Sequence, residues 1–241
     1  MRVIGHRGAA ALAPENTWAG FEAALRIGVD AIETDVRATG DGVLVLFHDA
    51  RLDRTTDGRG YVYETPWSVV RSLDAGSWFD DAFRGVRVPR LRETLARYGR
   101  RTHVVLEIKQ AGLGPDVLDV VRDLGLMGRV TFTTFDFARA RRIKTQAPGA
   151  NVGFLTSDLS SHNVRRVIAA HLDQVCPPAA CVTRENVAES QAQGLDVRAW
   201  GVQNRELMLR AIQAEVDGMT VDFPHLLLEA LGRRRQGGGS L

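Results

Sequence analysis

Acidic residues interrupt a segment that otherwise has the composition of a buried β-strand. Between Ala31 and Val36 the chain reads AIETDV, so Glu33 and Asp35 stand two residues apart among apolar and β-branched neighbours. Side chains alternate along a strand, and both carboxylates therefore point to the same face. Two buried like charges repel each other and lose their hydration unless a cation compensates them. Glu33 and Asp35 therefore indicate a cation-binding site.

A second strand-like segment, HVVLEIKQ, carries Glu107 and Lys109 on one of its faces. Together with Glu33 and Asp35, it would bring three carboxylates and no cysteine to one place. Oxygen ligands of this kind suit a hard divalent ion such as Mg²⁺ or Ca²⁺ rather than zinc. The sequence therefore predicts a metal site formed by Glu33, Asp35 and Glu107.

Basic and titratable residues accompany these acids. His6 and Arg7 lie in GHRG at the end of the first strand-like segment, and His48 follows the apolar segment 43–47. A metal flanked by Arg7 and Lys109 would be strongly positive and would attract an anionic phosphate. Two histidines of near-neutral pKa could then serve as acid and base in P–O bond cleavage.

The turn residues 39–42 predict a β-hairpin that returns His48 to the acids. If Ala38 faces Val43, the register places His48 opposite Glu33. A slip by one residue would turn His48 to the other face of the strand. We therefore expect this register in the structure.

The elements that must position these residues alternate between strand-like and helix-like along the whole chain. This alternation is typical of a parallel sheet covered by helices. Eight units in 241 residues favour a closed (β/α)8 TIM barrel, an α/β fold, over a doubly wound open sheet. The polar residues fall near the carboxyl ends of strands one, two and three, where barrel enzymes build their sites. The eight strand-like segments are 3–6, 31–36, 102–109, 129–134, 151–156, 173–182, 196–202 and 217–221.

One connection is much longer than the others. After the second strand and its hairpin, residues 50–89 are rich in aromatic side chains and predict a small inserted subdomain over the barrel mouth. The basic, glycine-rich end 233–241 predicts a disordered tail. We expect a single domain over residues 1–241.

Composition and patterning argue against several classes of protein. A net charge of +2 gives no broad basic surface for nucleic acid, and no apolar run reaches the roughly 18 residues of a membrane span. The first residues lack the pattern of a signal peptide, and the spacing of Cys176 and Cys181 fits neither a redox pair nor a zinc site. These features predict a cytoplasmic protein with free thiols, with neither a nucleic-acid partner nor a stable membrane association. They indicate no oligomeric state.

The order of the motifs resembles that of the glycerophosphodiester phosphodiesterase family. The likeness rests on GHRG followed by PENT, on GVDAIETDV and HD, on RTTDGRG, VPRLRETL and LEIK, and on VDGMTVDFP near the C-terminus. It extends over essentially the whole chain. It implies a TIM barrel with an insertion after the second strand and a place in lipid or glycerol metabolism. The implied reaction is the metal-dependent hydrolysis of glycerophosphodiesters to an alcohol and sn-glycerol 3-phosphate.

The resemblance also implies a role for each residue that matches a family motif. The stretch Trp200–Gln203 reads WGVQ where the family often has WTVN, and Val221 stands where a threonine is usual, so substrate preference stays open. The implied acid–base pair is His6 and His48, the implied metal ligands are Glu33, Asp35 and Glu107, and the implied substrate-binding residues are His6, Arg7, Lys109 and Trp200.

Two other functions stay open. A phospholipase D-like enzyme acting on lysophospholipids or sphingolipids could share this barrel and metal site, but it would need an apolar groove, for which only the aromatic residues of the insertion are candidates. A phosphate-binding barrel without catalysis would tolerate the loss of a histidine or an acid, and none is missing. The sequence shows neither which histidine is the acid nor whether water or the glycerol 2-hydroxyl is the nucleophile.

Overall fold

A closed parallel barrel is present in the computed structural model, which describes residues 1–233. Most of the predicted tail 233–241 lies outside the described residues, and Arg233 forms a two-point ion pair with Asp30. Within residues 1–233, no helix is both long and apolar enough to cross a membrane.

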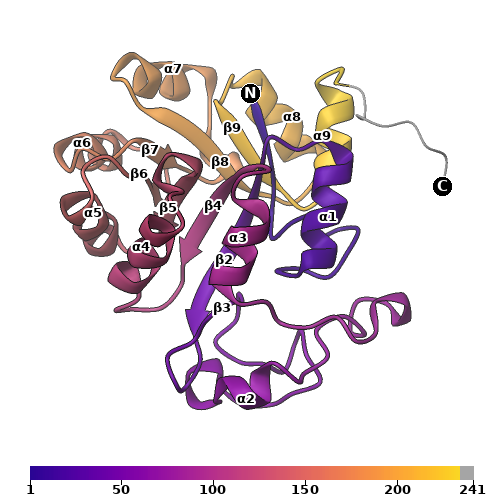
Figure 1. Cartoon of the computed structure of the whole chain (residues 1–241). Helices are drawn as coiled ribbons and strands as arrows, with labels where there is room; N and C mark the ends of the chain where they lie inside the picture. Colours follow the sequence, from indigo (N-terminus) through magenta and orange to yellow (C-terminus); the bar gives the residue numbers. More distant parts are fainter. Residues whose placement is uncertain (234–241) are drawn as a thin grey trace.

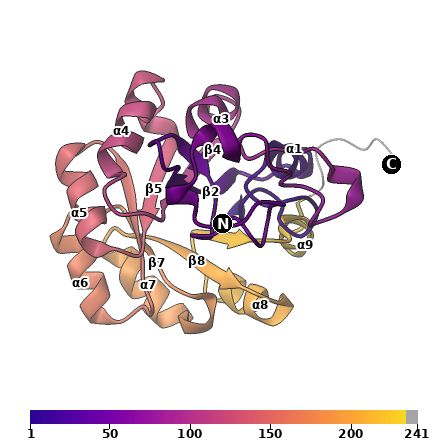
Figure 2. The same ribbon diagram turned by 90° about the horizontal axis from the view of Figure 1, so that it is seen from below.

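Eight strands form the barrel, and along the chain a helix lies between each barrel strand and the next. The sheet order is β1-β9-β8-β7-β6-β5-β4-β2, and the pairing of β1 with β2 closes it. The helices lie outside the strands (Figures 1 and 2), so the predicted (β/α)8 TIM barrel is confirmed. The barrel strands are β1 (Arg2–Gly5), β2 (Ala31–Ala38), β4 (His103–Ile108), β5 (Val130–Thr134), β6 (Asn151–Leu155), β7 (Gln174–Cys176), β8 (Asp196–Val202) and β9 (Gly218–Val221). The helices around them are α1 (Trp18–Ile27), α3 (Leu91–Tyr98), α4 (Gly114–Asp123), α5 (Phe137–Gln146), α6 (Ser161–Ala169), α7 (Arg184–Ala192), α8 (Arg205–Gln213) and α9 (Pro224–Ala230).

Local signals set the ends of these helices. The Thr17 hydroxyl accepts a hydrogen bond from the Gly20 amide and caps α1, and Gly28 ends that helix in a left-handed conformation with φ of +92°. Asp136 and Asn204 cap α5 and α8 in the same way as Thr17 caps α1. Each cap satisfies an amide that has no partner inside its helix, so the start of the helix is fixed relative to the preceding strand.

The two faces of the strands have different surroundings. Ile32 and Val36 of β2 and Leu106 of β4 are fully buried in the main core between the strands and the helices. The alternate residues Glu33 and Glu107 face the inside of the barrel, as the period of two requires. The fold therefore covers the apolar face with helices and turns the acids inward.

The segment after β2 forms an additional small core. Strand β3 (Leu44–Leu46) pairs antiparallel with β2, and a short helix, α2 (Trp67–Val70), follows. Figure 1 shows the segment that carries α2 beyond the carboxyl ends of β2 and β4. Its aromatic Tyr63 and Trp78 are exposed rather than buried. The buried residues of this core are Val45, Phe47, Leu52, Val62, Val70, Ala75 and Val88.

The predicted hairpin register is wrong by one residue. Ala38 pairs with Leu44 rather than with Val43. The reason lies in the turn, where the Thr39 amide donates to the Val43 carbonyl (3.0 Å) and Gly42 takes a φ of +81°. Val43 thus belongs to the turn, which moves every later residue of β3 by one position.

His48 reaches the barrel mouth because it lies beyond the paired part of the hairpin. The last ladder bond runs from the Phe47 amide to the Asp35 carbonyl (3.0 Å). His48 then lies in a bend, and the Arg37 guanidinium donates to its carbonyl oxygen (2.8 Å). The bend and this bond, not the strand register, therefore position His48.

Candidate active site

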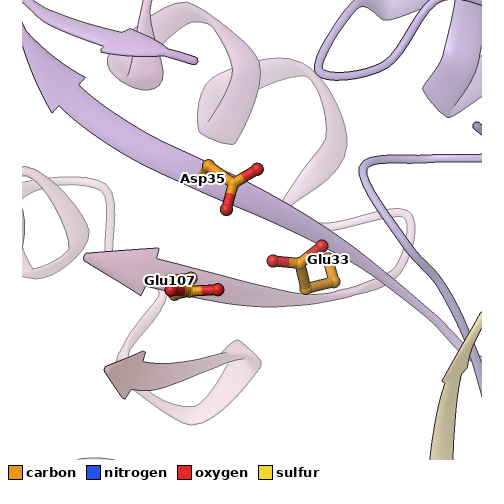
Figure 3. A group of neighbouring side chains, drawn as sticks. All are labelled: Glu33, Asp35 and Glu107. Atoms are coloured by element: carbon orange, nitrogen blue, oxygen red, sulfur yellow. The ribbon is translucent and has the colours of Figure 1, made fainter. Parts of the chain in front are cut away.

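Three buried carboxylates form the centre of the site. Glu33 and Asp35 come from β2, and Glu107 comes from β4, where it is the register partner of Asp35. One carboxylate oxygen from each lies within 4.8 Å of the others, and each residue is at most 9% exposed. Figure 3 shows the three side chains on two neighbouring strands. The structure thus brings the predicted metal ligands together.

The electrostatics of this acidic cluster favour a cation. Burial, followed by the charge of Asp35, raises the pKa of Glu33 to about 7. The same two causes raise the pKa of Glu107. Burial alone would raise the pKa of Asp35 as well, but the charges of Lys109 and Arg7 outweigh it, and the pKa is lowered. Deprotonation of all three acids therefore needs a further positive charge beside them.

Arg7 and Lys109 both contact the cluster. The Lys109 Nζ lies 2.6 Å from Glu107 Oε1 and 3.2 Å from Asp35 Oδ1. The Arg7 amide donates to Glu33 Oε2 (3.0 Å), and its Nε lies 3.2 Å from Asp35 Oδ2. Arg7 also has a φ of +50°, which is strained for a residue with a Cβ atom. The surrounding contacts thus hold Arg7 in an otherwise unfavourable conformation.

Asn16 of the PENT motif holds Asp35 in place, a role that sequence analysis missed. Its Nδ2 donates to Asp35 Oδ2 (2.9 Å). Its Oδ1 accepts from the Thr34 hydroxyl (2.6 Å) and from the Asp35 amide (3.1 Å). Asn16 binds only Oδ2 of the carboxylate. Asp35 Oδ1 forms no hydrogen bond among the described residues and has only the ion-pair contact with Lys109, so it can accept another ligand.

His6 is oriented by a residue from the other end of the chain. Its Nδ1 lies 2.5 Å from Asp222 Oδ1, and its Nε2 lies 3.9 Å from Glu33 Oε2. A carboxylate only accepts, so Nδ1 carries the hydrogen and Nε2 is directed toward the acids. Burial lowers the pKa of His6, but the bond to Asp222 and the charge of Glu33 outweigh burial, and the pKa is raised. Asp222 lies in VDGMTVDFP, but its role was not predicted.

His48, like His6, has its Nδ1 bound to an aspartate, but its surroundings differ from those of His6. Its Nδ1 donates to Asp49 Oδ1 (2.7 Å), and Asp49 in turn accepts two hydrogen bonds from Arg54. Burial lowers the pKa of His48, although the charge of Asp35 opposes this effect. Each histidine therefore has its Nδ1 fixed by an aspartate, while their pKa values shift in opposite directions.

A cavity of about 350 Å³ lies against this acidic cluster. Its apolar lining includes Phe135, Leu155 and Trp200, and the centroid of the Phe135 ring lies 6.0 Å from Lys109 Nζ. The rings of Phe135 and Trp200 meet edge to face with centroids 5.1 Å apart, and the indole Nε1 donates to the Cys176 carbonyl (2.9 Å). Among the predicted site residues, Asp35 alone does not line the cavity, because it lies behind the others against Asn16.

The chain is similar to known proteins over almost its full length. The sequence model of the glycerophosphoryl diester phosphodiesterase family matches residues 6–226. A glycerophosphodiester phosphodiesterase of Caldanaerobacter subterraneus subsp. tengcongensis is 32% identical, and the match covers 98% of each chain.

Solved structures agree with this similarity. The glycerophosphodiester phosphodiesterase of Agrobacterium tumefaciens superposes with a TM-score of 0.85 at 31% identity, over 95% of this chain and 99% of the other. A phosphodiesterase of Oleispira antarctica, solved in complex with the product sn-glycerol-3-phosphate, gives a TM-score of 0.86 at 28% identity, over 96% of this chain and 97% of the other.

Proposed function

Since the chain belongs to the glycerophosphoryl diester phosphodiesterase family and is an enzyme of that class, we propose that it hydrolyses glycerophosphodiesters with a divalent metal and two histidines. The products would be an alcohol and sn-glycerol 3-phosphate. The observation that carries this proposal is the meeting of His6 and His48 at one cavity with the acidic cluster.

Glu33, Asp35 and Glu107 would hold the metal, Mg²⁺ or Ca²⁺. Three observations support the fit: the donors are all hard oxygens, Asp35 Oδ1 is buried without a hydrogen-bond partner among the described residues, and the pKa values of Glu33 and Glu107 are raised. When bound, the ion would supply positive charge that stabilises the phosphate in the transition state.

Arg7 and Lys109 would bind the non-bridging phosphate oxygens. Both are at the cavity, and both already lie beside carboxylates of the acidic cluster. A divalent ion on those carboxylates would compete with the two cations and leave their donors available to an anion. The strained conformation of Arg7 supports a functional position rather than a purely structural one.

His48 would act as the general base and His6 as the general acid. The lowered pKa of His48 favours a neutral imidazole at neutral pH, which can accept a proton at Nε2. The raised pKa of His6 favours the protonated form, which can donate from Nε2 to the departing alcohol oxygen. Water would add to phosphorus as His48 takes its proton, and the P–O bond to the alcohol would break as His6 gives its proton.

Trp200 would contact the glycerol half of the substrate. Its ring packs edge to face against Phe135, and together the two rings form an apolar wall of the cavity. A cavity of about 350 Å³ with charged groups on one side favours a small polar diester over a lipid chain. Cytoplasmic location, a role in lipid or glycerol metabolism, and the lack of nucleic-acid and stable membrane partners accompany this function as predictions.

The test is the release of glycerol 3-phosphate from several glycerophosphodiesters, measured with Mg²⁺, with Ca²⁺ and with a chelator. We expect His6→Ala and His48→Ala each to lower kcat by about 10²- to 10⁴-fold. His162→Ala is the control, because His162 is exposed on α6 and does not line the cavity. Full activity in chelator, or in either catalytic-site variant, would overturn the mechanism.

A further inference from the structure

Arg198 is a buried cation on the side of the cavity away from the acidic cluster. It stands two residues before Trp200 on β8, so both side chains point into the barrel. Arg198 is only 2% exposed, yet it lines the same cavity as the two histidines. Its Nη1 donates to the Thr220 hydroxyl (2.5 Å). No role for Arg198 was predicted from the sequence.

One edge of the Arg198 guanidinium has no oxygen partner within residues 1–233, and the thiol of Cys176 is the polar group near it. Neither Nε nor Nη2 forms a hydrogen bond within the described part of the chain. These two nitrogens lie side by side, and this edge is the one that binds both oxygens of a carboxylate or two oxygens of a phosphate. The bond from Nη1 to Thr220 fixes the plane of the group and so leaves the paired donors in a set orientation.

Arg198 also lacks a negative charge beside it. Arg7 and Lys109, the other arginine and lysine residues that line the cavity, both contact carboxylates, whereas no carboxylate oxygen of residues 1–233 lies within 4.0 Å of Arg198. The neighbouring Cys176 cannot compensate, because burial raises the pKa of its thiol and keeps it neutral. A buried charge without a counter-charge is strongly unfavourable, so the site gains stability from an anion.

We propose that Arg198 forms a second anion subsite and selects diesters whose three-carbon half carries a carboxylate near the phosphate. This inference rests on the proposed function, which places the phosphate at Arg7 and Lys109. A planar carboxylate presents two oxygens and one charge to the open edge, whereas a glycerol hydroxyl presents one oxygen and no charge. The substrate class is a phosphodiester of glyceric acid with an alcohol. Its hydrolysis would follow the same balanced step and release phosphoglycerate.

The test compares two inhibitors of glycerophosphodiester hydrolysis, glycerol 3-phosphate and 3-phosphoglycerate. They differ only in that the second has a carboxylate where the first has a hydroxymethyl group. We expect the wild-type enzyme to bind 3-phosphoglycerate about ten- to a hundredfold more tightly, the value of a charge-assisted hydrogen-bonded pair. Arg198→Met, which keeps an unbranched apolar stem but removes the guanidinium and its charge, should abolish this preference.

A second variant and a control separate the subsite from a general loss of packing. Arg198→Lys keeps the positive charge but lacks the two paired donors of the guanidinium edge, so it should retain part of the preference for 3-phosphoglycerate. Arg139→Met removes another largely buried arginine, which binds the Ile108 carbonyl and does not line the cavity, and should leave the preference intact. Thermal unfolding of each variant verifies that it is folded.

Three results would overturn the inference: equal inhibition of the wild-type enzyme by both compounds, a preference that persists in Arg198→Met, or an equal weakening of both inhibitors by that variant. The second result would mean that the metal binds the carboxylate. The third would assign Arg198 to hydroxyl binding or to packing. If no glycerophosphodiester is hydrolysed, the proposed function itself fails. If glycerophosphodiesters are hydrolysed and one of the three results above is found, only this inference fails.

Discussion

The two sides of the cavity are built in different ways. On the side formed by β1, β2 and β4, each Lys, Arg, Asp and Glu side chain that lines the cavity is bound to another polar group. On the side formed by β5 to β8, apolar side chains dominate, and the buried Arg198 keeps two donors unpaired. The difference indicates that polar groups on the first side hold one another in place, whereas on the second side the donors of Arg198 are left for a ligand.

A chain of ion pairs makes the charged side rigid. Arg7 binds Glu15 (2.8 Å), Glu15 accepts two hydrogen bonds from Arg54 (both 2.8 Å), and Arg54 binds Asp49, the partner of His48. The network raises the pKa of Arg54, first through its hydrogen bond to Glu15. It connects the segment after β3 to Arg7 and to His48, so loss of one member would loosen both residues.

Apart from the two histidine variants, the largest effect should follow from Asp35→Asn. Asp35 contacts both cations and Asn16, and the variant removes one of the three charges available to a divalent ion. We expect kcat/KM to fall by about 10³-fold, because a metal contributes several kcal/mol to charge stabilisation. Isothermal titration with Mg²⁺ and Ca²⁺ should show weaker binding in parallel. Asp53→Asn, an exposed acid of the insertion, is the matched control, and an unchanged metal affinity in Asp35→Asn would contradict the assignment.

A smaller loss should follow from Arg54→Gln. Because Arg54 holds Asp49 and Glu15 rather than substrate, we expect kcat to fall by about 10- to 100-fold, as for other residues that orient a catalytic group. The KM should change less. Arg51→Gln is the control, since Arg51 pairs with Asp53 on the surface of the same segment. Equal kinetics of the two variants would show that the network does not position His48 or Arg7.

The charged side was largely predictable from sequence, and the reason is physical. Acidic residues are unusual in an apolar strand. Glu33, Asp35 and Glu107 therefore indicate a cation site even when their individual contacts are unknown. The ion pair of Arg54 with Glu15 joins residues 39 positions apart in irregular segments, where spacing predicts no contact. The hairpin register failed for a related reason, since it depended on whether Val43 belongs to the strand or the turn.

The opposite side of the cavity gave a weaker signal. Phe135 and Leu155 are apolar residues of the kind found in any core. Only their location at the carboxyl ends of strands indicates that they line the cavity. Arg198 is one of many arginines in the chain, and its burial without a counter-charge is visible only in three dimensions. Asp222 lies in a motif that was noticed, but its contact spans 216 positions and depends on barrel closure.

Asp222 lies directly after β9, between the two sides of the cavity, and Asp222→Asn should change the pH dependence more than the rate. The carboxylate raises the pKa of His6, and its loss should lower that pKa. If protonated His6 is the acid, activity falls as pH rises through its pKa, and the alkaline limb of kcat/KM should therefore move to lower pH. Asp119→Asn, on the exposed face of α4, is the control. An alkaline limb that stays in place would exclude His6 as the acid.

The smallest effect should come from the apolar wall, through Trp200→Leu. The edge-to-face contact with Phe135 is worth about 0.5–1.5 kcal/mol, so its loss should raise KM by about two- to tenfold. The kcat value should stay close to that of the wild type, because the contacts of the Trp200 indole are with the Phe135 ring and the Cys176 carbonyl. Trp78→Leu, an exposed indole of the insertion, provides the comparison. A large fall in kcat with unchanged KM would mean that the wall takes part in the reaction step, and the division between the two sides of the cavity would then be wrong.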